Sequence, residues 1–141
     1  MQQDLSVSSE PDRFEFQKWP VYVEARAFAV LAQKLCLKLP KTGTQSLGDQ
    51  FRRASQSIVL NIAEGSTRTT AKDKINFLRI AKGSTFECVA ISDLAMDFEL
   101  LTQEEQQDYQ SRLANIGRML SGMIRYWEKA PERKPSTSYA G

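Results

Sequence analysis

Apolar residues recur at alternating steps of four and three along four separate segments, and this spacing constrains the fold more than any other feature. Such steps place side chains on one face of an α-helix. No segment shows the alternation of apolar and polar residues, bounded by turn residues, that is typical of a β-strand. The spacing therefore predicts an all-α fold.

Each of the four segments carries its own, chiefly apolar, set at this spacing. The first set is Val21, Ala25, Phe28, Ala32, Leu35 and Leu39. The second set is Leu47, Phe51, Ala54, Ile58 and Ile62. The third is Phe77, Ala81, Ser84, Cys88, Ile91, Ala95 and Phe98, and the fourth is Leu113, Ile116, Leu120, Met123 and Trp127. The links between segments are short, so we expect an antiparallel up-down-up-down four-helix bundle.

Residues with known preferences for helix ends bound these segments. Pro20 suits the first turn of the first helix. Thr70 is a candidate N-cap for the third helix, and Thr102 with Glu105 forms a capping-box pattern before the fourth. Gly65 is expected to end the second helix as a cap with positive φ.

The chain of 141 residues is predicted to form one bundle domain over residues 14–130. The polar ends, residues 1–13 and 131–141, are predicted to be flexible tails. No apolar run reaches the roughly 18 residues of a membrane span, and we expect no export signal. The two cysteines, Cys36 and Cys88, form no CxxC motif. These features favour a cytoplasmic protein with no membrane partner.

The chain contains no histidine. This removes Ser-His-Asp and Cys-His catalysis and histidine-based zinc sites. Neither a GxGxxG nor a GxxxxGKS motif is present, so no phosphate-binding loop is indicated. We therefore expect no catalytic residue, no metal site and no cofactor, and an enzyme is the least favoured class of function.

Polar residues form a second pattern inside the predicted helices. Four of them follow one side of the second helix, and a glutamate lies on an otherwise apolar flank of the third. Two carboxylates can do acid–base chemistry, but ion pairs that fix helix register or partner choice are the stronger interpretation. We expect a largely buried polar network, within one bundle or between subunits, made of Arg53, Ser57, Asn61, Glu64, Arg79 and Glu87.

Spare apolar residues lie away from the main faces of two helices. Val59 and Leu60 project about 100° and 200° beyond Ile58. On the third helix, the displaced residues are Leu78, Val89 and Met96. A second apolar stripe on a helix often marks a subunit interface. The alternative is a broad core stripe with a few exposed aliphatic residues. We expect self-association.

Charge is unevenly distributed behind the net value of +2. Residues 47–82 carry seven basic and three acidic side chains, a net +4, and residues 112–141 carry six and two, again +4. Residues 83–111 carry seven acidic side chains and no basic ones, a net −7. Basic zones of this kind suit phosphate contacts. The candidate nucleic-acid-binding residues are Arg52, Arg68, Lys72, Arg118, Arg125 and Lys129.

The run from Leu47 to Ala95 resembles a bacterial four-helix bundle family, some of whose members are encoded in intervening sequences of large-subunit ribosomal RNA. The resemblance spans about residues 14–127, and Val59-Leu60 and Cys88 depart from it only as packing variations. The pieces that carry it are Arg52-Arg53-Ala54, Ser57-Ile58, Asn61-Ile62-Ala63-Glu64-Gly65, Phe77-Leu78, Ala81, Gly83-Ser84 and Glu87.

This resemblance implies an assembly more than an activity. Family members look like homopentamers around a central pore. A related protein, the accessory variability determinant of diversity-generating retroelements, is a basic pentamer that binds a reverse transcriptase and nucleic acid. The resemblance thus implies a homopentamer, and the related protein makes RNA or DNA a candidate partner. The alternative is a scaffold ring that binds a protein partner, such as a reverse transcriptase, without nucleic-acid contact.

Overall fold

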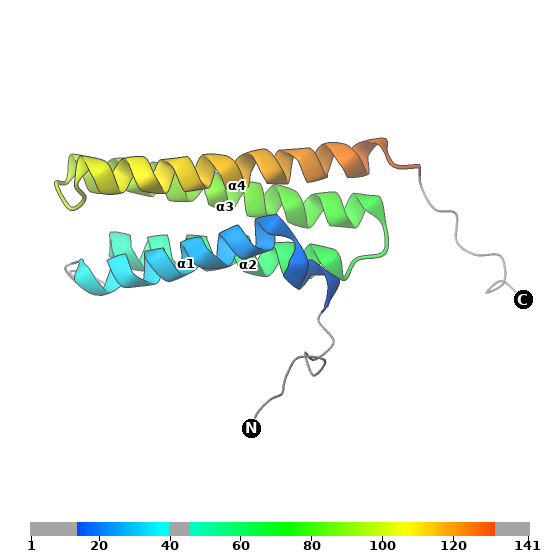
Figure 1. The fold of residues 1–141 in the computed structure, drawn as a ribbon, viewed down its shortest axis with the longest axis horizontal. Coiled ribbons are helices and arrows are strands. Elements are labelled where there is room, and N and C mark those ends of the chain that lie inside the picture. The colour runs from blue at the N-terminus through cyan, green and yellow to red at the C-terminus, as the bar shows by residue number, and fades with distance from the viewer. Residues whose placement is uncertain (1–13, 40–45, 132–141) are drawn as a thin grey trace, which may run out of the picture.

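The structure, a computed structural model, describes residues 14–39 and 46–131. It contains a short 3-10 turn, η2 (Glu15–Lys18), and four α-helices. The helices are α1 (Pro20–Lys38), α2 (Leu47–Ser66), α3 (Ala71–Asp97) and α4 (Gln103–Lys129). They run antiparallel in sequence order (Figure 1), and no strand occurs within the described ranges. The predicted all-α, up-down-up-down bundle is confirmed.

The helices pack around one core in the order α1, α2, α3, α4. The contacts of α2 with α3 and of α3 with α4 are the most extensive, and those of α1 with α4 are the sparsest. Because α1 and α3 make no direct contact of note, they occupy diagonal corners of the bundle. The predicted tails lie outside the described residues, apart from Pro131.

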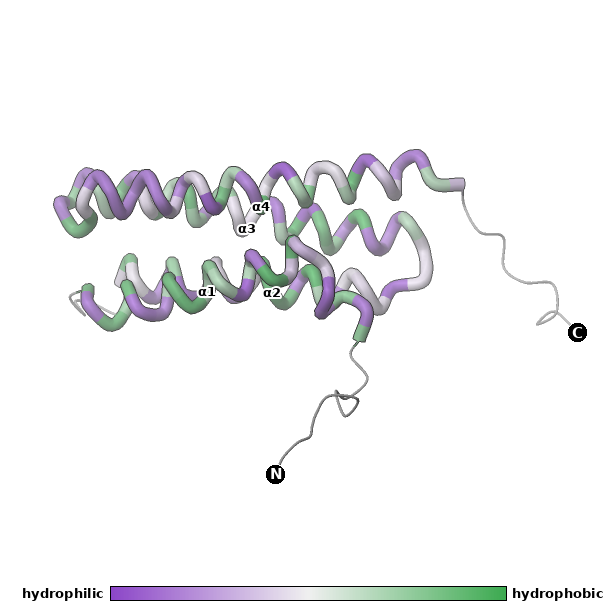
Figure 2. Tube along the Cα trace, in the orientation of Figure 1, coloured by the Kyte–Doolittle hydropathy of each residue, from purple (hydrophilic) through white to green (hydrophobic). Residues whose placement is uncertain are grey.

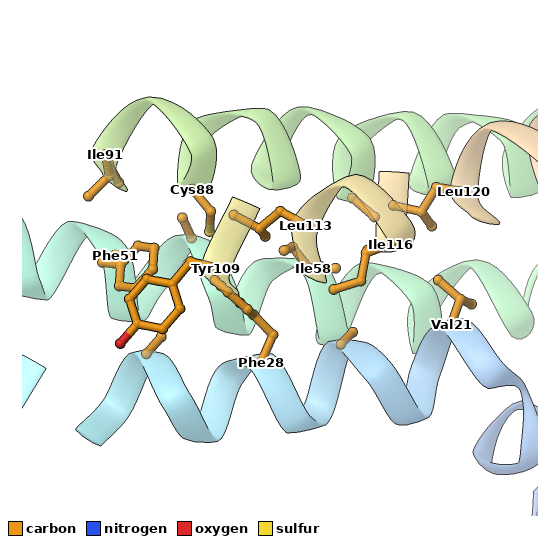
Figure 3. Close-up of a cluster of buried hydrophobic side chains, with 14 of the residues drawn as sticks. Val21, Phe28, Phe51, Ile58, Cys88, Ile91, Tyr109, Leu113, Ile116 and Leu120 are labelled. Atoms are coloured by element: carbon orange, nitrogen blue, oxygen red, sulfur yellow. The ribbon is translucent and has the colours of Figure 1, made fainter. Parts of the chain in front are cut away.

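The core follows the predicted apolar faces of α1 and α2 closely (Figure 3). At its centre three aromatic rings from different helices meet edge to face or tilted. The centroid of the Phe28 ring lies 5.5 Å from that of Phe51 and 5.9 Å from that of Tyr109. Aromatic pairs at such distances add stability beyond the area they bury. On a tube coloured by hydropathy, apolar segments interrupt polar ones along every helix (Figure 2).

The buried face of α3 includes the predicted Ala81, Ser84, Cys88, Ile91 and Ala95 but differs from the prediction at its margins. Leu78, assigned to a displaced face, is only 3% exposed, whereas Phe98, assigned to the core, is 60% exposed. The core residues of α3 run through Leu78, Thr85 and Ser92 at helical spacing. Thr85 and Ser92 are polar, so a search for apolar residues at helical spacing did not find this row. Their hydroxyls donate to the carbonyl oxygens of the preceding turn, at 2.9 and 2.8 Å, so burial leaves no unpaired hydroxyl.

The predicted N-caps are confirmed, but the role of Gly65 is not. The hydroxyls of Thr70 and Thr102 accept hydrogen bonds from backbone N–H groups three residues later. Gly65 lies inside α2, which ends at Ser66 and is followed by the C-cap Thr67, whose φ is an ordinary −83°. The prediction of a positive-φ cap is therefore wrong. Gly65 instead allows close packing, because a Cβ added there would lie 3.2 Å from Cβ of Phe77.

Leu39, Leu47 and Phe77, predicted as core, are only partly buried, and a further deviation lies near the end of α4. Ile124 is buried. Met123 and Trp127, predicted as core residues, are only partly buried and pack against the core. None of the helices in the described ranges combines the length and the hydropathy needed to span a membrane.

Candidate functional site

The centre of the predicted polar network forms between α2 and α3. A hydrogen bond joins the hydroxyl oxygens of Ser57 and Ser84 at 2.7 Å. The side-chain amide of Asn61 donates to the carbonyl oxygen of Ser57 at 2.8 Å and to its hydroxyl at 3.1 Å. These hydrogen bonds link three side chains across the contact between α2 and α3. Ser84 was predicted only as a core residue, and its place in the polar network was not predicted.

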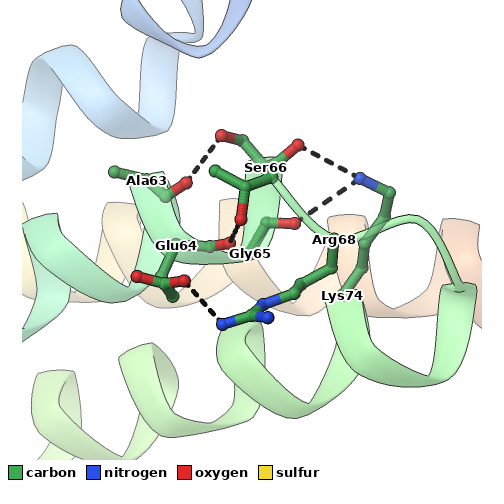
Figure 4. A network of polar contacts seen from close by, with 7 residues as sticks. Ala63, Glu64, Gly65, Ser66, Arg68 and Lys74 are labelled. Atoms are coloured by element: carbon green, nitrogen blue, oxygen red, sulfur yellow. Dashed lines mark hydrogen bonds and ion pairs between the residues drawn. The ribbon is translucent and has the colours of Figure 1, made fainter.

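The other members take different partners. Glu64, in the last turn of α2, accepts a hydrogen bond from Arg68, which lies just after that helix, with 2.6 Å between Oε2 and Nη2 (Figure 4). Arg79 reaches across to α4 and pairs with Glu128 at 2.9 Å. The spacing of Glu64 and Arg68 was visible in the sequence, whereas the pair between α3 and α4 depended on their packing.

Arg53 and Glu87 are both exposed and make no ion pair with another residue of the described ranges. The predicted burial of Arg53, Glu64 and Glu87 is therefore not met within a single chain. Arg53 lies one turn before Ser57 on α2, and Glu87 lies one turn after Ser84 on the antiparallel α3. The two side chains are thus level with each other on the same outer surface.

Exposed aliphatic residues lie among these polar side chains. Leu60, Ile80 and Leu94 are all exposed, and Leu60 most of all at 65%. At about 100° per residue, Leu60 follows the same side of α2 as Arg53 and Glu64. Ile80 and Leu94 lie seven residues on either side of Glu87. We call this surface the α2–α3 face, and its members are Arg53, Leu60, Glu64, Ile80, Glu87 and Leu94.

The spare apolar residues that were predicted to form a second stripe differ in their burial. Leu60 is the one that is exposed. Val59, Val89 and Met96 pack partly buried against the core, and Leu78 belongs to it. For these residues the broad-core alternative is correct, because bundle helices bury more than one narrow row of side chains.

A further exposed apolar row, absent from the sequence-based prediction, follows α1. Val23, Val30 and Leu37 recur every seven residues and are exposed, Leu37 at 66%. We call these three residues the α1 stripe. The stripe lies on the outer side of α1, because Val30 is two residues, or about 200° around the helix, from both Phe28 and Ala32, which are buried. The α1 stripe and the α2–α3 face therefore point to different sides of the bundle.

The basic residues of α4 form an outward row. Arg118, Arg125 and Lys129 are exposed, fall within about 40° of one another and have no carboxylate within 4.0 Å in the described part of the chain. They are the α4 basic row. Of the other basic residues predicted to bind nucleic acid, Lys72 is exposed and makes no ion pair with a described residue.

Two of the predicted basic residues are already engaged by carboxylates of α2. The guanidinium of Arg52 lies 3.9 Å from Asp49. That of Arg68 pairs with Glu64 and lies over the ring of Phe77, 4.6 Å from its centroid. Phosphate binding by Arg68 would have to break both of these contacts, so the α4 basic row carries the stronger candidate site.

The cysteines are poorly placed for chemistry. Both are buried and unpaired. Burial, together with the charge of Glu87, raises the pKa of Cys88 to about 12, so its reactive thiolate form is scarce at neutral pH. Within the described ranges no three His, Cys, Asp or Glu side chains gather as a metal ion would require.

Comparison with known proteins places this geometry in a family. Residues 17–122 match the family described as 23S rRNA-intervening sequence protein. The chain belongs to that family. The match covers the four helices as far as Gly122, and so includes the α1 stripe and the α2–α3 face.

A solved structure agrees with this membership. The chain is 25% identical to a protein of unknown function from the S23 ribosomal protein family of Bacteroides thetaiotaomicron VPI-5482. The two structures align with a TM-score of 0.69 over 74% of this chain and 95% of that protein. No curated protein matches the chain.

Proposed function

We propose that this member of the 23S rRNA-intervening sequence protein family assembles with copies of itself and binds RNA or DNA through phosphate contacts. The observation that carries the proposal is the pair of unlike apolar surfaces on different sides of one bundle. Exposed aliphatic residues grouped in this way mark association surfaces more often than scattered single ones do.

Two unlike surfaces favour head-to-tail association. Each copy presents its α1 stripe to the α2–α3 face of the next copy, and such contacts close into a ring when the rotation between copies allows it. The family resemblance favours five copies. A two-fold dimer through either surface would leave the other one exposed, whereas head-to-tail contacts use both.

The polar residues of the two surfaces are complementary. Lys34 lies between Val30 and Leu37 on the outer side of α1, and it is exposed without an ion pair in the described ranges. Glu87 lies between the aliphatic residues of the α2–α3 face. An ion pair between Lys34 and Glu87 of adjacent copies would fix their register and give Glu87 the buried environment that a single chain lacks.

Nucleic-acid binding rests on the α4 basic row. Its three cations have no carboxylate partners in the described ranges, and assembly would repeat the row in every copy. Phosphate contacts position a protein on nucleic acid without reading bases. We therefore expect affinity without sequence preference, governed by release of counterions. The two buried thiols suit the reducing cytoplasm in which such a complex would work.

A protein-binding scaffold is the second candidate function. It is favoured by the exposed carboxylates near the turn between α3 and α4, which include Asp97, Glu99 and Glu104. Such a surface would attract a basic partner protein, for example a reverse transcriptase, and would repel nucleic acid.

Binding of labelled RNA and duplex DNA over a salt series separates the two functions. We expect binding at low salt, with a log–log slope of about −0.9 for each phosphate contacted on duplex DNA. The double substitution Arg118→Glu/Arg125→Glu should weaken binding to all sequences alike and flatten the slope. Lys38→Glu/Arg112→Glu, with the same change of charge outside the row, should have a much smaller effect. An assembled wild-type protein that binds neither probe at low salt would exclude the nucleic-acid function and favour the scaffold.

A further inference from the structure

A cavity of about 390 Å³ lies at the end of the bundle where α1 begins and α4 ends. The η2 turn lies against one side of it, and the buried residues Ile62 and Leu78 form part of its wall. Trp19 and Trp127, the two tryptophans of the chain, also line it. Cavities that bind small molecules have volumes of roughly 300–1,000 Å³ and mostly apolar walls with a few polar groups.

One cation, Lys74, lines this mostly apolar space, whose other polar lining residues are Glu15, Ser66 and Thr67. The ammonium of Lys74 donates to the carbonyl oxygens of Gly65 and Ser66, at 3.5 and 3.4 Å (Figure 4). Both distances are long for N–H···O hydrogen bonds. The ammonium also lies 5.2 Å from the centre of the Trp127 ring.

The charge of Lys74 has no anionic partner among the described residues. No carboxylate of the described residues lies within 4.0 Å of the ammonium, and the carboxylate of Glu15, on the exposed rim, makes no ion pair with it. Burial lowers the pKa of Lys74, because the charged form loses hydration. An anion in the cavity would restore the missing compensation.

We propose that this cavity binds a small carboxylate with an apolar body. The carboxylate accepts hydrogen bonds from the ammonium of Lys74, and the apolar body packs between Trp19 and Trp127. A monoanion fits best because one ammonium balances one negative charge, whereas a phosphate dianion would leave a charge unpaired in an apolar space. Capping of α2 by Lys74 would explain the contacts with the carbonyl groups, but it requires neither a cavity nor two aromatic walls.

Tryptophan fluorescence tests the proposal directly, because both tryptophans line the cavity. We expect decanoate, used below its micelle concentration, to change the emission saturably. Decanol, which has a similar body but no charge, should bind roughly ten-fold more weakly, since hydrogen bonds between charged groups are the stronger kind. Lys74→Met should remove this difference while keeping decanol binding, and Lys72→Met, on the exposed surface nearby, should behave as the wild type.

Three results would overturn the proposal. A fluorescence signal that does not saturate would show that the cavity takes no such ligand. Equal binding of decanoate and decanol by the wild-type protein would remove the role of the charge, and this comparison needs no variant. Unchanged decanoate binding in a folded Lys74→Met protein would assign the carboxylate to another site.

Discussion

The hydroxyls of Ser57 and Ser84 share a hydrogen bond of 2.7 Å across the α2–α3 contact. The bond marks the register in which the two antiparallel helices pack, and in this register Arg53 lies level with Glu87 on the outer surface. The α2–α3 face thus combines apolar and charged residues of both helices.

Loss of the Ser84 hydroxyl should destabilise the bundle modestly. Ser84→Ala leaves Ser57 bonded to Asn61, so no buried group is stranded. We expect the free energy of unfolding, measured by urea denaturation, to fall by about 0.5–1.5 kcal/mol. Ser111→Ala, at an exposed position of α4, should change it by less than about 0.5 kcal/mol. Equal effects at both positions would show that the inter-helix bond is not formed.

Two glycine substitutions should have opposite signs. Alanine raises helix propensity by about 1 kcal/mol at either position. At Gly65, however, the new Cβ would lie 3.2 Å from Cβ of Phe77, an atom fixed to the backbone of α3. At Gly117 nothing lies within 4 Å. We expect Gly65→Ala to lower the melting temperature and Gly117→Ala to raise it, and a rise for both would contradict the close packing of α2 on α3.

Cys88 should make stability depend on alkaline pH. Its pKa is about 12 in the folded chain against 9.0 as a model thiol, so the folded state holds the proton more tightly. The resulting stabilisation is complete below pH 9 and is lost as the pH rises toward 12, at a slope of up to about 1.4 kcal/mol per pH unit. Urea denaturation from pH 8 to 11 should show a steeper loss for the wild type than for Cys88→Ala. Parallel curves would mean that the thiol is exposed.

Charge reversal should test the ion pair between copies. Glu87 is exposed and has no ion pair in the described ranges, so Glu87→Lys should leave helix content unchanged but weaken assembly. Adding Lys34→Glu should restore assembly, because the positive and negative partners of the ion pair are then exchanged between the two positions. Adding Lys38→Glu, at another lysine of α1, should not. Recovery of assembly with both second substitutions would indicate a general effect of net charge.

The sequence allowed the fold to be predicted because α1 and α2 bury apolar residues at regular spacing, as from Val21 to Leu35. On α3 it was right only in part. The predicted Ala81, Ser84, Cys88, Ile91 and Ala95 are buried, but the prediction chose Phe77 in place of Leu78 and missed the polar Thr85 and Ser92. Helix propensity and spacing do not say which neighbour satisfies a buried hydroxyl. That information comes from the packed structure.

The candidate sites depended even more on packing. The α4 basic row could be predicted, because it needs only the geometry of one helix. The polar network was predicted as one cluster, yet Arg79 pairs with Glu128 of α4, a partner set by the crossing of two helices. The α1 stripe was not predicted. Val23, Val30 and Leu37 recur every seven residues, and so do the buried residues Val21, Phe28 and Leu35, so the two sets are interleaved along the sequence.

A mixing experiment tests head-to-tail assembly most directly. Val30→Glu places a charge on the α1 stripe, Leu60→Glu places one on the α2–α3 face, and both positions are exposed, so both variants should fold. By sedimentation, each alone should be a monomer of about 16.0 kDa. Together they should form a one-to-one dimer of twice that mass, because each retains the surface that the other lacks. An assembled Val30→Glu or Leu60→Glu protein, or a mixture that stays monomeric, would contradict the account.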